Sequence, residues 1–177
     1  MTSLRILFTF ILAVVPLMGC DTGSSVPKES GPTGPVEFSD PVTVLQVIDG
    51  DTLEVMRDGE AFRVRMKGID TPELYPDSGE PEPLAEEARS FVAGRLGLQV
   101  GLEYDDACGT VPGVTCLDDY GRTLAYVRLS NGDDLALLLL EAGLARLMVF
   151  GGDPFDRLTP YQEAETAAHI AGIGIWQ

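Results

Sequence analysis

The sequence is poor in histidine, cysteine and basic residues. It has one histidine, three cysteines, and 12 lysines and arginines against 28 aspartates and glutamates, which gives a net charge of −16. A single histidine argues against a Ser-His-Asp hydrolase, and the cysteines lack the paired spacing of a zinc site. Tight nucleic-acid binders usually carry a basic surface, so the charge argues against tight, processive binding of such polymers. It still allows a catalytic site with local positive charge and a bound cation.

The sequence also lacks an apolar run long enough for a transmembrane helix, which needs about 20 residues. Arg5 precedes a shorter apolar run over residues 6–15, and this region ends at Leu17-Met18-Gly19-Cys20. The pattern predicts a secretory signal peptide over residues 1–19. The Leu-x-Gly-Cys ending resembles the bacterial lipoprotein box, in which Cys20 is lipidated after cleavage; an ordinary signal with an incidental Cys20 is the alternative. A lipid anchor would hold the protein on the extracytoplasmic side of a bacterial membrane, either periplasmic or at the cell surface.

The rest of the chain divides into a tether and one domain. Residues 20–40 are rich in glycine, serine, proline and threonine, a composition that cannot form a core and predicts a flexible tether. Residues 41–177 are long enough for a single domain with a core of its own. We expect this domain to be a monomer.

Within residues 41–177, alternating and β-branched segments predict five strands, and helical spacing predicts three helices. The expected strands cover residues 42–48, 52–57, 61–66, 100–104 and 123–129, and the expected helices cover residues 83–96, 134–142 and 160–171. Asp58-Gly59 predicts a tight hairpin turn. This order is typical of an α+β domain built on a five-stranded OB-fold barrel.

Two cysteines remain in the domain, Cys108 and Cys116, and they flank a stretch with two glycines and a proline. In an oxidising compartment outside the cytoplasm a disulfide persists. The sequence therefore predicts a local Cys108–Cys116 bridge, with two free thiols as the alternative.

Three short segments carry residues suited to phosphodiester chemistry: Asp49-Gly50-Asp51-Thr52, Asp70-Thr71-Pro72-Glu73 and Asp119-Tyr120-Gly121-Arg122. If their strands are neighbours, Asp51 and Asp70 can share one calcium ion with a backbone carbonyl and waters. Glu73 can take a proton from an attacking water.

Arginine supplies the positive charge that such a site needs. Arg65 and Arg122 can hold a phosphate and stabilise its growing negative charge. Each residue also has a structural alternative: the aspartates as turn residues, Glu73 as a solvated loop acid, and the arginines in surface ion pairs.

Four further segments belong with these three: Val47-Ile48 before the first, Thr123 to Val127 after the last, Gly143-Leu144-Ala145, and the closing Ile175-Trp176. Together the segments resemble the thermonuclease family, the staphylococcal nuclease homologues. The resemblance implies an OB-fold nuclease that cleaves DNA and RNA with calcium, on single-stranded or locally opened substrate. It implies that Thr71 adds its backbone carbonyl to the metal ligands Asp51 and Asp70. It also implies that Asp49 supports the metal site and that Tyr120 lies in the nucleotide site.

The sequence departs from the family at the nucleotide site. Asp119 stands where the family often has lysine, the stretch from Met148 to Gly151 replaces family tyrosines, and the loop after Glu73 is acidic. Weaker stacking and phosphate contacts are therefore expected, with Phe150 as a substitute stacking residue. The departures keep two alternatives open: a catalytically weak or inactive OB-fold binding module of the cell envelope, and a structural lipoprotein that uses calcium only for stability.

Overall fold

The computed structural model describes residues 37–108, 116–149 and 155–177. The expected signal peptide, Cys20 and most of the expected tether lie outside these residues. The described residues all belong to one compact unit, residues 34–177. Within the described residues, no helix has the length and hydrophobicity to cross a membrane.

The centre of this unit is a closed barrel of five strands in the order β1-β2-β3-β6-β5. The strands are β1 (Pro41–Asp49), β2 (Thr52–Arg57), β3 (Glu60–Met66), β5 (Gln99–Glu103) and β6 (Thr123–Arg128). The first three form an antiparallel meander, with Asp58-Gly59 turning β2 into β3. Strand β6 runs parallel to β3, and β5 pairs with both β6 and β1 to close the barrel. The predicted five-stranded OB-fold barrel is confirmed.

Alternating residues of the strands fill the barrel interior, as the period of two requires. Leu53 and Val55 of β2 face inward with Val64 and Met66 of β3 and are almost fully buried. The remaining core comes from apolar residues of β5, β6 and the helices.

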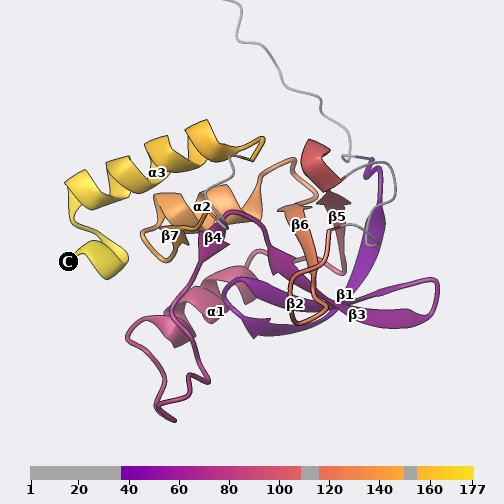
Figure 1. The fold of residues 1–177 in the computed structure, drawn as a ribbon, viewed down its shortest axis with the longest axis horizontal. Coiled ribbons are helices and arrows are strands. Elements are labelled where there is room, and N and C mark those ends of the chain that lie inside the picture. Colours follow the sequence, from indigo (N-terminus) through magenta and orange to yellow (C-terminus); the bar gives the residue numbers. More distant parts are fainter. Residues whose placement is uncertain (1–36, 109–115, 150–154) are drawn as a thin grey trace, which may run out of the picture. The chain divides into compact units, whose positions relative to one another are not determined.

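The described residues include the three α-helices expected from the sequence: α1 (Ala85–Ala93), α2 (Leu135–Glu141) and α3 (Leu158–Ala171). Helix α1 packs against β1 and α2, and α2 packs against β6 and α3 (Figure 1). Helix α1 begins two residues later than predicted, because Leu84 before it has a left-handed backbone with φ 70°, and it ends three residues earlier, at Ala93. Helix α3 begins two residues earlier than predicted, at Leu158. The described residues also include two 3₁₀ turns, η1 (Asp106–Cys108) and η3 (Gly174–Trp176).

A second, two-stranded sheet was not predicted. Strand β4 (Ile69–Asp70) pairs antiparallel with β7 (Arg146–Leu147), with Asp70 opposite Arg146. This pairing fixes the backbone of Asp70 where the chain leaves the barrel after β3. It therefore holds the Asp70 carboxylate near the start of β2.

Candidate active site

Asp51 is held in the two-residue turn between β1 and β2. Its side chain is almost buried; Oδ1 accepts a hydrogen bond from Thr52 Oγ1 at 3.0 Å, and Oδ2 accepts one from the Thr71 backbone N–H at 2.9 Å. The preceding Gly50 leaves room for this contact, since a Cβ there would lie 2.7 Å from Thr71 Oγ1 and 2.9 Å from Ala88 Cβ. The turn, the segment after β4 and helix α1 therefore meet at Asp51.

Arg65 of β3 lies between the carboxylates of Asp51 and Asp70. It is 5% exposed; Nη1 lies 2.6 Å from Asp51 Oδ2 and donates to the Ile69 carbonyl at 2.9 Å, while Nη2 donates to Asp70 Oδ1 at 2.7 Å. A buried guanidinium with two carboxylate partners is fixed in direction as well as in charge. Arg65 therefore faces Asp51 and Asp70, and its charge is directed into the candidate site.

Negative charge exceeds positive charge around Arg65. Burial raises the pKa of Asp49 above its ordinary value against two backbone hydrogen bonds that lower it, and the Asp51 carboxylate adds to the rise. Burial also raises the pKa of Asp70 despite the opposing pull of Arg65, with smaller contributions from the carboxylates of Asp51 and Glu82. Carboxylates that repel one another at a half-buried position favour a bound cation.

The residues present fit the oxygen-rich shell that calcium prefers. Asp51 and Asp70 share one partner, and the Thr71 hydroxyl oxygen beside them is buried without a hydrogen-bond partner. In the described part of the chain, no three acidic, histidine or cysteine side chains come together as a metal-binding group. A calcium shell here would therefore depend on the two carboxylates together with the Thr71 backbone carbonyl, as the family resemblance implies.

Glu73 lies at the exposed edge of this cluster. Its backbone N–H donates to Glu82 Oε2 at 3.0 Å, and the next N–H, that of Leu74, donates to Asp49 Oδ2 at 3.3 Å. Desolvation, and then the carboxylates of Asp70 and Glu82, raise the pKa of Glu73. A carboxylate with a raised pKa is a stronger base, which suits proton removal from water.

Arg122 reaches the same cluster through Thr52. Its Nε donates to Asp118 Oδ2 at 2.6 Å, and its Nη1 lies 3.5 Å from Thr52 Oγ1, the hydroxyl that donates to Asp51. The turn before it depends on Gly121, whose φ of +74° is left-handed. Tyr120 is 85% exposed, and the Arg122 guanidinium lies 5.3 Å from its ring centre.

The structure thus brings together the acids and arginines chosen from the sequence. Asp51, Arg65, Asp70 and Thr71 are in direct contact, and the remaining residues, Asp49, Glu73, Arg122 and Tyr120, adjoin them. Cys20 lies outside the described residues, as do Phe150 and Gly151.

Sequence reasoning missed three residues that hold the site in place: Thr52, Glu82 and Asp118. Asp118 accepts from the backbone N–H groups of Tyr120 and Arg122 as well as from the guanidinium. An acid four residues before Arg122 in the sequence indicates an ion-pair partner for that arginine. The contact between Glu82 and Glu73 has no comparable signal in the sequence.

A pocket of about 520 Å³ adjoins the carboxylates. Its wall includes Asp70, Thr71, Glu82 and Arg146 together with residues near the C-terminus. It gives the cluster an open side toward solvent.

Comparison with known proteins agrees with this geometry. The family model described as "Staphylococcal nuclease homologue" matches residues 63–177. A thermonuclease of Staphylococcus intermedius is 36% identical over 136 residues, which cover 76% of this chain and 74% of the relative. A thermonuclease of Staphylococcus hyicus is 41% identical over 104 residues, 58% of this chain and 56% of the relative.

A third relative is more distant. The SPbeta prophage-derived endonuclease YokF of Bacillus subtilis is 31% identical over 140 residues, covering 76% of this chain and 43% of the relative. The matched region of the family model contains Arg65, Asp70, Glu73 and Arg122 and begins after Asp51. With the barrel and the clustered acids and arginines, these matches show that the chain belongs to the staphylococcal nuclease homologue family.

Proposed function

We propose that this protein hydrolyses phosphodiester bonds in DNA, RNA or both, with calcium as its cofactor. The observation that carries the proposal is the position of Arg65 between Asp51 and Asp70, with Glu73 and Arg122 adjoining. That arrangement joins cation-binding oxygens, a base and two phosphate-binding cations in one site. The curated relatives named thermonucleases support it, and the binding-module alternative is not favoured because the set of reactive side chains is complete.

The chain's own residues account for binding and proton transfer. A guanidinium has five N–H donors, and Arg65 uses two of them in hydrogen bonds to the Ile69 carbonyl and Asp70, while its Nη1 also forms an ion pair with Asp51. The other donors of Arg65, together with those of Arg122, hold the phosphate and stabilise the charge that gathers on it during attack. Glu73 accepts a proton from the attacking water. Calcium, when held by Asp51, Asp70 and the Thr71 carbonyl, supplies further neutralisation of the phosphate charge.

The proposal extends to the location of the protein. Residues 1–19 would direct export, and lipidated Cys20 with a tether to residue 40 would hold the domain on the extracytoplasmic side of a bacterial membrane as a monomer. The composition of residues 1–40 supports this part of the proposal.

The role of Glu73 is tested with Glu73→Gln, which removes the base and keeps the size of the side chain. We expect cleavage of single-stranded DNA to fall by about 10²- to 10⁴-fold, the usual contribution of a general base, with the melting temperature unchanged. Glu80→Gln, in the same exposed loop, is the matched control and should keep wild-type activity. Equal activity of both variants would refute the assignment of Glu73.

A further inference from the structure

The turn that carries Arg122 is held by one carboxylate. Asp118 Oδ1 accepts from the backbone N–H groups of Tyr120 and Arg122 at 2.9 and 2.8 Å, and Asp118 Oδ2 accepts from Arg122 Nε. Burial raises the pKa of Asp118, but the contacts with Arg122 and the Tyr120 N–H outweigh it and hold that pKa below its ordinary value. The direction of the Arg122 guanidinium therefore depends on where Asp118 lies.

The backbones of Arg122 and Asp118 are joined by a hydrogen bond from the Asp118 N–H to the Arg122 carbonyl at 3.0 Å, and each is also held by a further element. Arg122 directly precedes β6, whose first residue, Thr123, pairs with Val64 of β3. Asp118 lies on the opposite arm of the turn, which begins at Cys116. That arm meets β6 through a Leu117–Thr123 bridge and through the Cys116 carbonyl, which accepts from the Leu124 N–H at 2.8 Å.

A disulfide fixes the start of this arm. Cys116 is bonded to Cys108, with the two Cα atoms 5.1 Å apart, and both cysteines are buried. The bridge that the sequence predicted is therefore present. It connects the arm that carries Asp118 to turn η1 through a bond between residues eight positions apart in the sequence.

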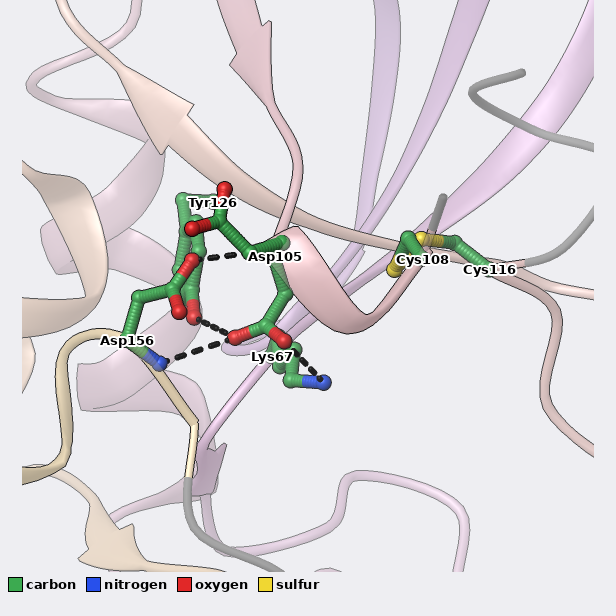
Figure 2. The surroundings of a disulfide bond; sticks show 7 residues. Lys67, Asp105, Cys108, Cys116, Tyr126 and Asp156 are labelled. Atoms are coloured by element: carbon green, nitrogen blue, oxygen red, sulfur yellow. Dashed lines mark hydrogen bonds and ion pairs between the residues drawn. A yellow bond between two sulfur atoms is a disulfide. The ribbon is translucent and has the colours of Figure 1, made fainter. Parts of the chain in front are cut away.

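Turn η1 itself rests on a buried polar cluster (Figure 2). The Cys108 N–H donates to the Asp105 carbonyl at 2.8 Å, and the Asp105 carboxylate, 2% exposed, accepts from Tyr126 Oη at 2.6 Å and from the Asp156 N–H at 2.9 Å. Lys67 Nζ lies 3.6 Å from the same carboxylate. Because Tyr126 belongs to β6, Lys67 follows β3 and Asp156 precedes α3, the disulfide links the Asp118 arm to three parts of the framework.

We propose that the Cys108–Cys116 disulfide positions Arg122 for phosphodiester cleavage through Asp118, so that full activity requires the oxidised chain. The inference rests on the proposed function. In the reduced chain β6 still holds the Arg122 backbone, but the Asp118 arm loses its covalent anchor. The long Arg122 side chain then samples more rotamers and spends less time directed at the phosphate. Both cysteines are positioning residues, since neither contacts the reacting atoms.

The redox step is a thiol–disulfide exchange. The two thiols lose two protons and two electrons as the S–S bond forms, and a disulfide of the exchange-catalyst class takes them up and becomes a dithiol. A dithiol reagent such as dithiothreitol reverses the step and becomes a cyclic disulfide. An exported chain meets the oxidising condition that such a bond needs.

The test is a double-mutant cycle with the full-length chain. We expect Cys108→Ser/Cys116→Ser to lower kcat on single-stranded DNA by about 10- to 100-fold, the range for a misplaced catalytic group, with a smaller change in KM. In an Arg122→Ala background the same cysteine changes should have no further effect. If the cysteine changes lowered kcat by the same factor in the wild-type and the Arg122→Ala backgrounds, the disulfide would have a merely structural role and the proposal would be overturned.

A second measurement follows the Arg122 side chain directly and does not depend on enzyme activity. The Arg122 Nε–H, held by Asp118, should give a slowly exchanging NMR signal in the oxidised chain that weakens after dithiothreitol, while circular dichroism shows the fold retained. An unchanged signal after reduction would overturn the proposal, even if the cysteine variant fails to fold. Should the oxidised wild type be inactive while this signal still responds to reduction, the proposed function would fail and the positioning of Arg122 would stand.

Discussion

At the residue scale, Arg65 is the positively charged partner that the Asp51 and Asp70 carboxylates share. Its three contacts, with Asp51, the Ile69 carbonyl and Asp70, leave little room for a substitute side chain. A lysine has one ammonium and cannot reproduce this planar fork. Arg65 therefore serves the fold as well as the chemistry.

Arg65→Ala should make the fold depend on calcium. Asp51 would remain almost buried without its partner, and breaking a buried pair in this way costs about 3 kcal/mol. We expect urea unfolding without calcium to show a loss of that size, and added calcium to recover part of it because a cation again faces Asp51 and Asp70.

The exposed neighbour on the same strand, Arg63→Ala, is the control and should show neither effect. A stability of Arg65→Ala that is unchanged, or lowered without any response to calcium, would contradict this account of the site.

The residues of the site were largely predictable, and the residues that hold them were not. Asp51, Asp70 and Arg122 stand beside turn-forming residues, so their segments stand out in the sequence. Thr52 contacts Arg122 across 70 positions of the chain, and Glu82 contacts Glu73 across an irregular loop of nine positions. Spacing along the chain carries no signal for such contacts.

At the scale of elements, one ionic network joins two strands and two helices. Glu103 of β5 accepts from Arg128 Nε of β6 at 3.0 Å and from its Nη2 at 2.9 Å, and also contacts Arg157 before α3. Arg157 Nη1 lies 2.6 Å from Asp134, which caps α2 by accepting from the Ala136 N–H at 3.0 Å. The network holds α2 and α3 against the barrel, and its residues lie outside the candidate active site.

This network predicts a loss of stability in acid. The hydrogen bonds from Arg128, and with them the charge of Arg157, hold the pKa of Glu103 below its ordinary 4.5. A lowered folded-state pKa contributes stability that is present above pH 4.5 and is lost as the pH falls through the folded-state value.

Glu103→Gln should therefore have a lower free energy of unfolding than wild type at neutral pH, and this difference should shrink as the pH falls below 4.5. Urea unfolding across that pH range measures the difference, and the exposed Glu60→Gln is a control whose difference from wild type should not change with pH. A difference for Glu103→Gln that stays constant with pH would show that ionisation of Glu103 does not stabilise the fold.

Elements with a periodic pattern were predictable, whereas those set by contacts were not. Strand β3 shows its alternation in the sequence, with Val64 and Met66 in the core and Arg63 exposed, while Arg65 is buried against its two carboxylate partners. Strands β4 and β7 have two residues each, too few for any period, and exist because Asp70 pairs with Arg146 across the chain. The start of α1 depends on the left-handed Leu84, a conformation that leucine does not signal.

At the scale of the whole molecule, the net charge of −16 opposes the charge of the polyanionic substrate that we propose for this site. Long-range repulsion opposes the approach of nucleic acid, and the local attraction comes from Arg65 and Arg122. Substrate affinity therefore depends on few phosphate contacts.

Binding of single-stranded DNA should accordingly depend weakly on salt. Each neutralised phosphate contributes a slope of about −0.7 in log K against log salt, so two arginines give about −1.4. Fluorescence anisotropy measures the slope with the Glu73→Gln variant, whose cleavage should be about 10²- to 10⁴-fold slower. A value of about −4 or steeper would mean six or more phosphate contacts and an extended basic path that this account does not contain.

Cleavage of single-stranded DNA by the full-length protein, first with calcium and then after a chelator, tests the central claim most directly. The account predicts cleavage with calcium that stops when the chelator removes the ion and returns when calcium is restored in excess. A folded protein that leaves the DNA intact at high enzyme and low salt, or that cleaves equally well with the chelator present, would contradict it.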